Sequence, residues 1–320
     1  MILICAKEDD AHTVKVADIL RRHAEEFFVF DTSTFPTSVS LTGSFGNGAT
    51  DLRLTQDSRR IHLQDIKSFW WRRPQPMEID PRIADPQARG FAFQECISAL
   101  YGMLECCETL WVNDIHNDSA AEYKALQLKL AGEEGFSIPE TLITNSPADL
   151  LQFWEKHDHR VIYKAFNQRA LVWRPTRILR DEDLTMLPNL RHAPVIFQTL
   201  VPGLSDVRVT VIGEKVFATE FDIEHLEGVD YRFRMTEIPC RPHDLPPALE
   251  TKILTFMERL GLEFGGIDFR VTPDGEYVFF EINPDGEFIY LEDRTGQPIA
   301  EAMADHLRTA KPSRQAKAMR

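Results

Sequence analysis

Three oxygen-bearing side chains lie near the C-terminal end of the sequence, on two segments with the pattern of β-strands. Asp268 stands in the first segment, and Glu281 and Asn283 stand in the second, two residues apart and therefore on one strand face. Glu281 interrupts the apolar run Val278–Ile282, where a carboxylate must be exposed, paired or bound to a cation. Oxygen ligands without His or Cys suit Mg²⁺. The pattern predicts a magnesium site, although an amphipathic strand with one polar face has the same spacing.

Two cationic side chains interrupt strand-like segments in a similar way. Lys164 lies within Val161–Phe166, and Arg208 lies within Val207–Ile212. A lysine is rare in such a position unless an anionic partner is near, and either cation could contact phosphate. A solvent-facing strand side accommodates both cations equally well, so this alternative stays open. Lys124 lies on a predicted helix and, taken alone, is typical of a helix surface.

Several common catalytic motifs are missing from the sequence. No Gly-x-Gly-x-x-Gly, Gly-x-x-x-x-Gly-Lys or Gly-x-Ser-x-Gly segment occurs, which argues against the usual dinucleotide-binding, P-loop and α/β-hydrolase proteins. The histidines are scattered without the spacing of metal ligands. The five cysteines include no Cys-x-x-Cys pair, so we expect reduced thiols and neither a disulfide framework nor a zinc site.

The composition is that of a folded globular chain. The 320 residues include 36 Lys and Arg against 50 Asp and Glu, a net charge of −14, and 43% of them are hydrophobic. This acidic balance disfavours nonspecific nucleic-acid binding, which depends on cations that neutralise phosphates. No apolar run approaches the roughly 20 residues of a membrane helix, and the acidic N-terminus does not resemble a secretory signal. We therefore expect a cytoplasmic protein with neither a membrane nor a nucleic acid as partner.

The front third of the chain alternates strand and helix patterns. The predicted elements there are Ile2–Cys5, His12–His23, Phe27–Phe30, Ile66–Trp71, 90–107 and Leu110–Val112. Residues 37–60 are polar and predict a small hairpin or a loose insertion. A helix that begins at Asp118 or Ser119 and ends near Glu134 follows. This part of the chain predicts an α/β domain.

The rest of the chain predicts a mixed, mainly antiparallel α+β structure. The strand-like segments are Val161–Phe166, Leu171–Leu179, Val195–Val201, Val207–Ile212, Val216–Phe221 and Phe233–Ile238. The turn Pro273–Gly275 predicts a hairpin between two further strands, 266–271 and 277–282. Because these strands follow one another with few helices between them, a single doubly wound sheet does not fit the back half.

Taken in order, these pieces resemble the ATP-grasp fold. Lys124 is followed eleven residues later by Gly135 and then by Pro139–Thr141, which is similar to the opening of the family's central domain. Lys164 stands where a strand lysine of that family contacts the nucleotide phosphates. The resemblance runs from about residue 113 to residue 308. It implies an ATP-grasp fold preceded by an N-terminal α/β pre-ATP-grasp domain.

The resemblance implies ATP and Mg²⁺ as cofactors and a role for each matching residue. The implied nucleotide contacts are Lys124, Lys164, the hinge residues Gln198, Leu200 and Val201, and the acid-x-Arg pair Asp206 and Arg208. The implied Mg²⁺ ligands are Asp268, Glu281 and Asn283. Arg208 would hold the phosphates during the reaction, since phosphate-binding side chains in phosphoryl transfer act by positioning and charge stabilisation.

Further motifs narrow the resemblance to one subfamily. Asp31–Pro36, the Trp-Trp-Arg-Arg-Pro segment of Phe69–Pro74, Asn145, Asp230–Arg232 and Asn283–Glu292 are similar to the microviridin-type ATP-grasp enzymes, or graspetide synthetases. These enzymes cross-link side chains of a ribosomally made precursor peptide, which has a leader and an acidic core. The resemblance implies ATP-dependent activation of Asp or Glu side chains and closure of ester or amide rings. Arg232 is our candidate partner of the substrate carboxylate, because a guanidinium matches a carboxylate bidentately.

This resemblance divides the chain into four parts. They are an N-terminal pre-ATP-grasp domain (1–116), a central ATP-grasp subdomain (117–196), a C-terminal ATP-grasp subdomain (197–310) and a basic tail (311–320). The family also implies a possible homodimer. Two alternatives stay open: a ligase that joins free small-molecule carboxylates to amines, and a peptide-binding protein without catalysis.

Overall fold

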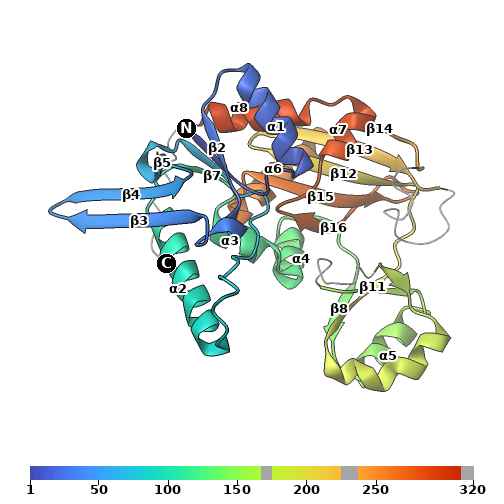
Figure 1. Cartoon of the computed structure of the whole chain (residues 1–320). Helices are drawn as coiled ribbons and strands as arrows, with labels where there is room; N and C mark the ends of the chain where they lie inside the picture. The colour runs from blue at the N-terminus through green and yellow to red at the C-terminus, as the bar shows by residue number, and fades with distance from the viewer. Residues whose placement is uncertain (167–174, 225–236, 311–320) are drawn as a thin grey trace.

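A parallel sheet of four strands, in the order β2-β1-β6-β7, organises the N-terminal part of the chain (Figure 1). The computed structural model describes residues 1–166, 175–224 and 237–310. It places the four strands at Ile2–Cys5 (β1), Phe27–Phe30 (β2), Ser68–Trp70 (β6) and Leu110–Val112 (β7). The strands are short and mostly apolar, as strands of parallel sheets covered on both faces are. The predicted α/β front third is therefore confirmed.

A second, three-stranded antiparallel sheet is inserted between β2 and β6. Its strands are β3 (Val39–Gly46), β4 (Ala49–Gln56) and β5 (Arg59–His62), with short 3₁₀ turns η1 (Thr32–Thr34) and η2 (Leu63–Asp65) before and after them. The sequence predicted only a small hairpin or a loose insertion at residues 37–60. Figure 1 shows the β3–β4 hairpin reaching out from the body of the molecule.

Four α-helices lie in the first 133 residues. The prediction of one continuous helix over 118–134 is wrong. Besides α1 (Ala11–Arg22) and α2 (Pro86–Leu104), the single helix predicted for 118–134 is two helices, α3 (Ile115–Ala121) and α4 (Lys124–Glu133). The side-chain amide of Gln127 donates to the carbonyl of the last α3 residue, which the break leaves without a helical partner. The break places Lys124 at the first turn of α4.

The central part is a four-stranded antiparallel sheet in the order β10-β9-β11-β8. Its strands are β8 (Thr141–Thr144), β9 (Val161–Lys164), β10 (Arg177–Ile178) and β11 (Val195–Thr199). The helix α5 (Pro147–Lys156) and the 3₁₀ segment η3 (Asp181–His192) cover one face, around a core that includes Trp154 and Phe197. The first half of the predicted strand Leu171–Leu179 lies outside the described residues.

The C-terminal part is a five-stranded antiparallel sheet in the order β14-β13-β12-β15-β16. The strands are β12 (Ser205–Ile212), β13 (Lys215–Asp222), β14 (Cys240–Pro242), β15 (Phe264–Val271) and β16 (Tyr277–Asn283). The helices that follow or interrupt them are α6 (Pro247–Leu260), α7 (Ile289–Thr295) and α8 (Ile299–Arg308). Most of the predicted strand Phe233–Ile238 and the basic tail 311–320 lie outside the described residues. The antiparallel back half is confirmed.

One hydrophobic core joins the two ends of the chain. It includes Ile4 of β1, Trp70 of β6, Phe264 of β15, Leu291 of α7 and Met303 of α8, all less than 3% exposed. The N-terminal parallel sheet is therefore packed against the C-terminal part rather than tethered to it. All five cysteines are free, as predicted. Across the described ranges, no helix combines the length and the apolar character that a membrane crossing requires.

Candidate active site

The three predicted magnesium ligands lie together on one face of the C-terminal sheet. Asp268 on β15 is the direct cross-strand partner of Glu281 on β16, and Asn283 follows two residues later on the same face. The amide nitrogen of Asn283 lies 3.4 Å from Oδ2 of Asp268. Two carboxylates and an amide oxygen are hard donors, so this set fits Mg²⁺. In the described ranges, no group of three or more His, Cys, Asp or Glu side chains suited to a metal ion occurs.

Two cations lie against these carboxylates. Nζ of Lys124 is 2.9 Å from Oε2 of Glu281, and a terminal nitrogen of Arg208 is 2.8 Å from Oδ2 of Asp268. Because these side chains are mostly buried, salt screens the two pairs only weakly. Together with Asn283 the four side chains form a compact cluster of alternating charge. We call these five residues the metal–phosphate cluster, since such a set can hold polyphosphate and its metal ion.

Close approach of the backbone fixes the guanidinium of Arg208. A Cβ atom at Gly266 would lie 2.2 Å from one terminal nitrogen of Arg208, and a Cβ atom at Gly286 would lie 2.5 Å from the same nitrogen. Both distances are shorter than any van der Waals contact, so only glycine leaves room for the guanidinium at these two positions. The sequence Asn283-Pro-Asp-Gly286 thus contributes a metal ligand at its start and one wall of the arginine site at its end.

Lys164 lies on the central sheet, on the face turned away from the α5 core. In the sheet register, Ile196 of β11 is paired with Ile143 of β8 on one side and with Lys164 of β9 on the other, so the three side chains share a face. Lys164 is only 9% exposed. An aliphatic surface with one cation suits an adenine ring and its phosphates, and the nucleotide contact of Lys164 stays a prediction.

The predicted adenine hinge follows directly on β11. Gln198 is buried, the amide of Leu200 donates to the carbonyl of Arg160 at 2.8 Å, and the carbonyl of Val201 accepts from Arg270 at 3.2 Å. The Leu200 amide is therefore already engaged within the protein. Adenine recognition by Gln198, Leu200 and Val201 stays a prediction, and it would use other backbone groups of this segment.

Asp206 has a partner that the sequence reasoning missed. Its carboxylate accepts two hydrogen bonds from Arg270, at 2.7 and 2.9 Å, and both side chains are 7% exposed. The bidentate pair joins β12 to β15 two residues along each strand from the pair between Arg208 and Asp268. Arg270 follows Asp268 by two residues, so strand alternation was a signal for its position. A nucleotide contact of Asp206 stays a prediction.

Gln127 is a second missed residue. It lies three residues after Lys124 on α4 and is 1% exposed. Its side-chain amide donates to the carbonyl of Ile282 at 2.8 Å and accepts from the amide of Ile282 at 3.1 Å. Ile282 stands between the two β16 members of the metal–phosphate cluster. The spacing of three residues on one helix face was the only sequence signal for this contact.

The structure thus brings five of the predicted site residues into one cluster and places the others on neighbouring elements. Lys164 and the hinge lie on the central sheet, and Asp206 lies on β12 beside the cluster. Arg232 lies outside the described residues, so its contact with the substrate stays a prediction.

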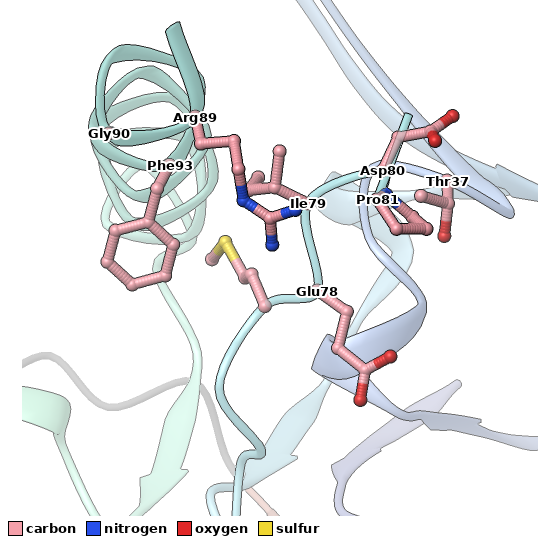
Figure 2. A pocket seen from close by; sticks show the side chains of 9 residues that line it. Thr37, Glu78, Ile79, Asp80, Pro81, Arg89, Gly90 and Phe93 are labelled. Atoms are coloured by element: carbon pink, nitrogen blue, oxygen red, sulfur yellow. The ribbon is translucent and has the colours of Figure 1, made fainter. Parts of the chain in front are cut away.

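A separate hollow of about 790 Å³ lies between α2 and the segment 77–81 (Figure 2). Figure 2 shows the guanidinium of Arg89 directed over Ile79, while the carboxylates of Glu78 and Asp80 point away from it. Asp80 is occupied by hydrogen bonds from Arg82. No residue of the metal–phosphate cluster lines this hollow, so it is distinct from the candidate active site.

Comparisons with known proteins agree with this geometry. The family model of the MvdD pre-ATP-grasp domain matches residues 1–119. A search of curated protein sequences found no match. Among solved structures, the macrocyclase MdnB from Microcystis aeruginosa MRC is 30% identical with a TM-score of 0.79, and the match covers 96% of this chain and 98% of that one. This chain belongs to the ATP-grasp macrocyclases.

Two further ATP-grasp ligases are similar over their whole length. The RiPP-associated ligase of Chryseobacterium gregarium, solved with ADP and a leader and core peptide, is 28% identical with a TM-score of 0.86 and 96% coverage of both chains. The ligase PsnB, solved with minimal precursor, Mg and ADP, is 28% identical with a TM-score of 0.77 and 96% coverage of both chains. Members of the family thus bind adenine nucleotide and magnesium. The chain is an ATP-dependent ligase with the ATP-grasp fold.

Proposed function

We propose that this macrocyclase activates Asp or Glu side chains of a ribosomally made precursor peptide with ATP and closes ester or amide rings within that peptide. The observation that carries the proposal is the metal–phosphate cluster, in which residues from α4, β12, β15 and β16 meet on one sheet face. The full-length similarity to ligases solved with leader, core or precursor peptides supports the choice of a peptide substrate.

The proposed reaction has two balanced steps. An oxygen of the peptide carboxylate attacks the γ-phosphorus of ATP, the bond to the ADP oxygen breaks, and an acyl phosphate forms. A hydroxyl or amine of the same peptide then attacks the acyl carbon, phosphate leaves with the bonding electrons, and the nucleophile loses its proton. The peptide loses one water per ring, while ATP becomes ADP and phosphate.

The residues of the chain position the reacting groups and balance their charge. Lys124 and Arg208 are placed to bind phosphate oxygens, and Asp268, Glu281 and Asn283 would hold Mg²⁺, which supplies charge neutralisation at the phosphates when bound. The ion pairs of the cluster keep its cations and carboxylates in place, because each charge has an opposite charge within 3 Å. Such preorganised charge stabilises phosphoryl transfer without covalent help from the protein.

Arg232 is the proposed partner of the peptide carboxylate. A guanidinium fork would orient the carboxylate for attack on the phosphorus. We expect Arg232→Ala to abolish ring formation and Arg232→Lys to retain part of it. Ring formation by Arg232→Ala at the wild-type rate would contradict this role.

The remaining proposals concern partners and location. We propose that the N-terminal domain and its junction with the central subdomain recognise the leader of the peptide. We also propose that the enzyme acts in the cytoplasm as a homodimer. Light scattering of the purified chain at several concentrations tests the dimer, because a monomer at every concentration would contradict it.

The function is tested by incubating the candidate precursor encoded beside this gene with the enzyme, ATP and Mg²⁺. We expect the peptide to lose one or more waters by mass spectrometry, and Glu281→Gln to abolish this loss because it removes a carboxylate of the cluster. Glu276→Gln is the matched control, since Glu276 is exposed on the turn of the same hairpin.

The other outcomes discriminate between the alternatives. An unchanged peptide, with ADP released when free carboxylates and amines are added, would favour the small-molecule ligase. An absence of ADP release with every substrate would favour the non-catalytic peptide-binding protein.

A further inference from the structure

A tight turn, Asn283–Gly286, follows the strand that carries two residues of the metal–phosphate cluster. The amide of Gly286 donates to the carbonyl of Asn283 at 3.2 Å and closes the turn. The turn starts at a candidate metal ligand and ends at the glycine that packs on the Arg208 guanidinium. Its conformation therefore sets the position of both groups.

The other carbonyls of this turn are bound by side chains of the N-terminal part. The side-chain amide of Asn113 donates to the carbonyl of Pro284 at 2.8 Å. The guanidinium of Arg72 donates to the carbonyls of Asp285 and Gly286, at 2.5 and 3.5 Å. Arg72 and Asn113 are both 1% exposed, so water does not compete for these bonds.

The two donors stand at one edge of the parallel sheet. Arg72 follows the end of β6 by two residues, and Asn113 follows the end of β7 directly. His12, which lies in the first turn of α1 after β1, extends the same row, and its Nε2 accepts from the amide of Phe288 at 2.9 Å. The carboxyl ends of parallel strands are where α/β sheets bind their ligands. In this chain, side chains at that edge bind backbone groups of the segment 284–288, which follows β16.

We infer that Arg72 and Asn113 are positioning residues, through which the N-terminal domain fixes the Asn283–Gly286 turn and, with it, the metal–phosphate cluster. This inference rests on the proposed function of the cluster. It gives the Trp-Trp-Arg-Arg-Pro segment a role, because one terminal nitrogen of its first arginine binds two successive carbonyls of the turn while the other lies 3.0 Å from Nδ1 of His12. A lysine keeps the charge but has a single nitrogen, which cannot occupy both of these positions.

The test compares three variants by magnesium-dependent ADP binding, measured by calorimetry without peptide. Arg72→Lys removes the planar guanidinium that contacts the turn and His12, and Gly286→Ala leaves Arg72 in place but moves the guanidinium of Arg208. We expect each to weaken Mg²⁺-dependent ADP binding by about 10- to 100-fold, the range for groups that orient metal ligands. Lys15→Met is the matched control, since Lys15 pairs with Glu292 and Asp293 across the same two parts of the chain without touching the turn.

A second readout follows the turn itself in the protein without nucleotide or metal. We expect the amide of Gly286 to exchange its hydrogen at least about 10-fold faster in Arg72→Lys than in wild type, because the carbonyls of Asp285 and Gly286 lose the guanidinium that binds them. A purely structural role would lower the melting temperature and leave both the exchange of this amide and the Mg²⁺ dependence of the folded protein unchanged.

Each outcome decides the inference. Wild-type ADP binding and Gly286 exchange in folded Arg72→Lys would overturn it. If Arg72→Lys does not fold, wild-type Mg²⁺-dependent ADP binding by Gly286→Ala would overturn it. Because no readout contains peptide, a wild-type protein that binds Mg²⁺ and ADP but closes no ring would contradict the proposed function and leave this inference standing.

Discussion

Two arginine–aspartate pairs link β12 to β15. In one pair the aspartate is on β12, and in the other it is on β15. The pairs differ in burial and in their neighbours, which indicates different roles. Asp206 and Arg270 form a bidentate pair with both side chains 7% exposed. In the second pair, a terminal nitrogen of Arg208 lies 2.8 Å from Oδ2 of Asp268, whose side chain is 18% exposed and borders Asn283. The first pair has the character of a buried structural contact, and the second lies where a metal ion and phosphates can replace the ion pair.

This contrast predicts that two matched substitutions differ in their main effect, one on stability and the other on activity. Asp206→Asn leaves a buried guanidinium without its counter-charge and should lower the free energy of unfolding by about 3–5 kcal/mol. Asp268→Asn should cost less stability but reduce ring formation by about 100-fold or more, since even groups that only orient metal ligands contribute about 10- to 100-fold. Urea denaturation and peptide turnover measure the two quantities. Equal loss of stability in both variants would contradict the distinction.

At the scale of elements, local patterns predicted most of the strands, but not β14 or the full three-stranded insertion β3–β5. Asp268, Glu281 and Asn283 were predictable because strand alternation alone puts them on one face. The roles of Gln127 and Arg270 were not predictable, since their partners lie far away in sequence on other elements.

The break between α3 and α4 was not predicted for the same reason, because it depends on contacts with residues far away in sequence. A long helical pattern predicted one helix over 118–134, but the Gln127 side chain satisfies the carbonyl at the end of α3 and also clamps Ile282. Both bonds depend on the sheet being in place. The short helix α7 (Ile289–Thr295) was missed as well, because seven residues are too few for a period to be recognised.

The contribution of the Gln127 contacts with Ile282 of β16 can be tested by measuring the free energy of unfolding. Gln127→Leu keeps the volume but leaves the buried amide and carbonyl of Ile282 unpaired, so we expect the free energy of unfolding to fall by about 1–3 kcal/mol. Gln94→Leu on the exposed surface of α2 is the control and should change stability by less than about 0.5 kcal/mol. Chemical denaturation measures both. A Gln127→Leu variant as stable as its control would show that the clamp contributes nothing.

At the scale of the whole molecule, the N-terminal sheet and the C-terminal site form one unit through buried polar contacts. His12 lies at their interface, with Nδ1 3.0 Å from a terminal nitrogen of Arg72 and Nε2 accepting from the amide of Phe288. Burial, and then the adjacent guanidinium of Arg72, lowers the pKa of His12 to about 3. The imidazole is therefore neutral at physiological pH.

This histidine makes stability depend on pH. Because the folded-state pKa lies below the unfolded value of about 6.5, the unfolded chain binds more protons between these values, and stability falls as pH falls below 6.5. From pH 7 to pH 5 this group alone should cost about 2 kcal/mol. His12→Gln, which does not titrate at this position, should lose correspondingly less stability over the same pH range. Urea denaturation at both pH values measures the difference, and parallel pH profiles of wild type and His12→Gln would refute it.

The central claim is that the enzyme activates peptide carboxylates as acyl phosphates. The most direct test follows the carboxylate oxygen through the reaction. A precursor peptide whose Asp and Glu side chains carry ¹⁸O is treated with the enzyme, ATP and Mg²⁺, and the released phosphate is analysed by mass spectrometry. Activation as an acyl phosphate predicts one ¹⁸O atom in phosphate for each ring closed, with ADP as the other product. Rings that form with unlabelled phosphate, or with AMP in place of ADP, would contradict the account.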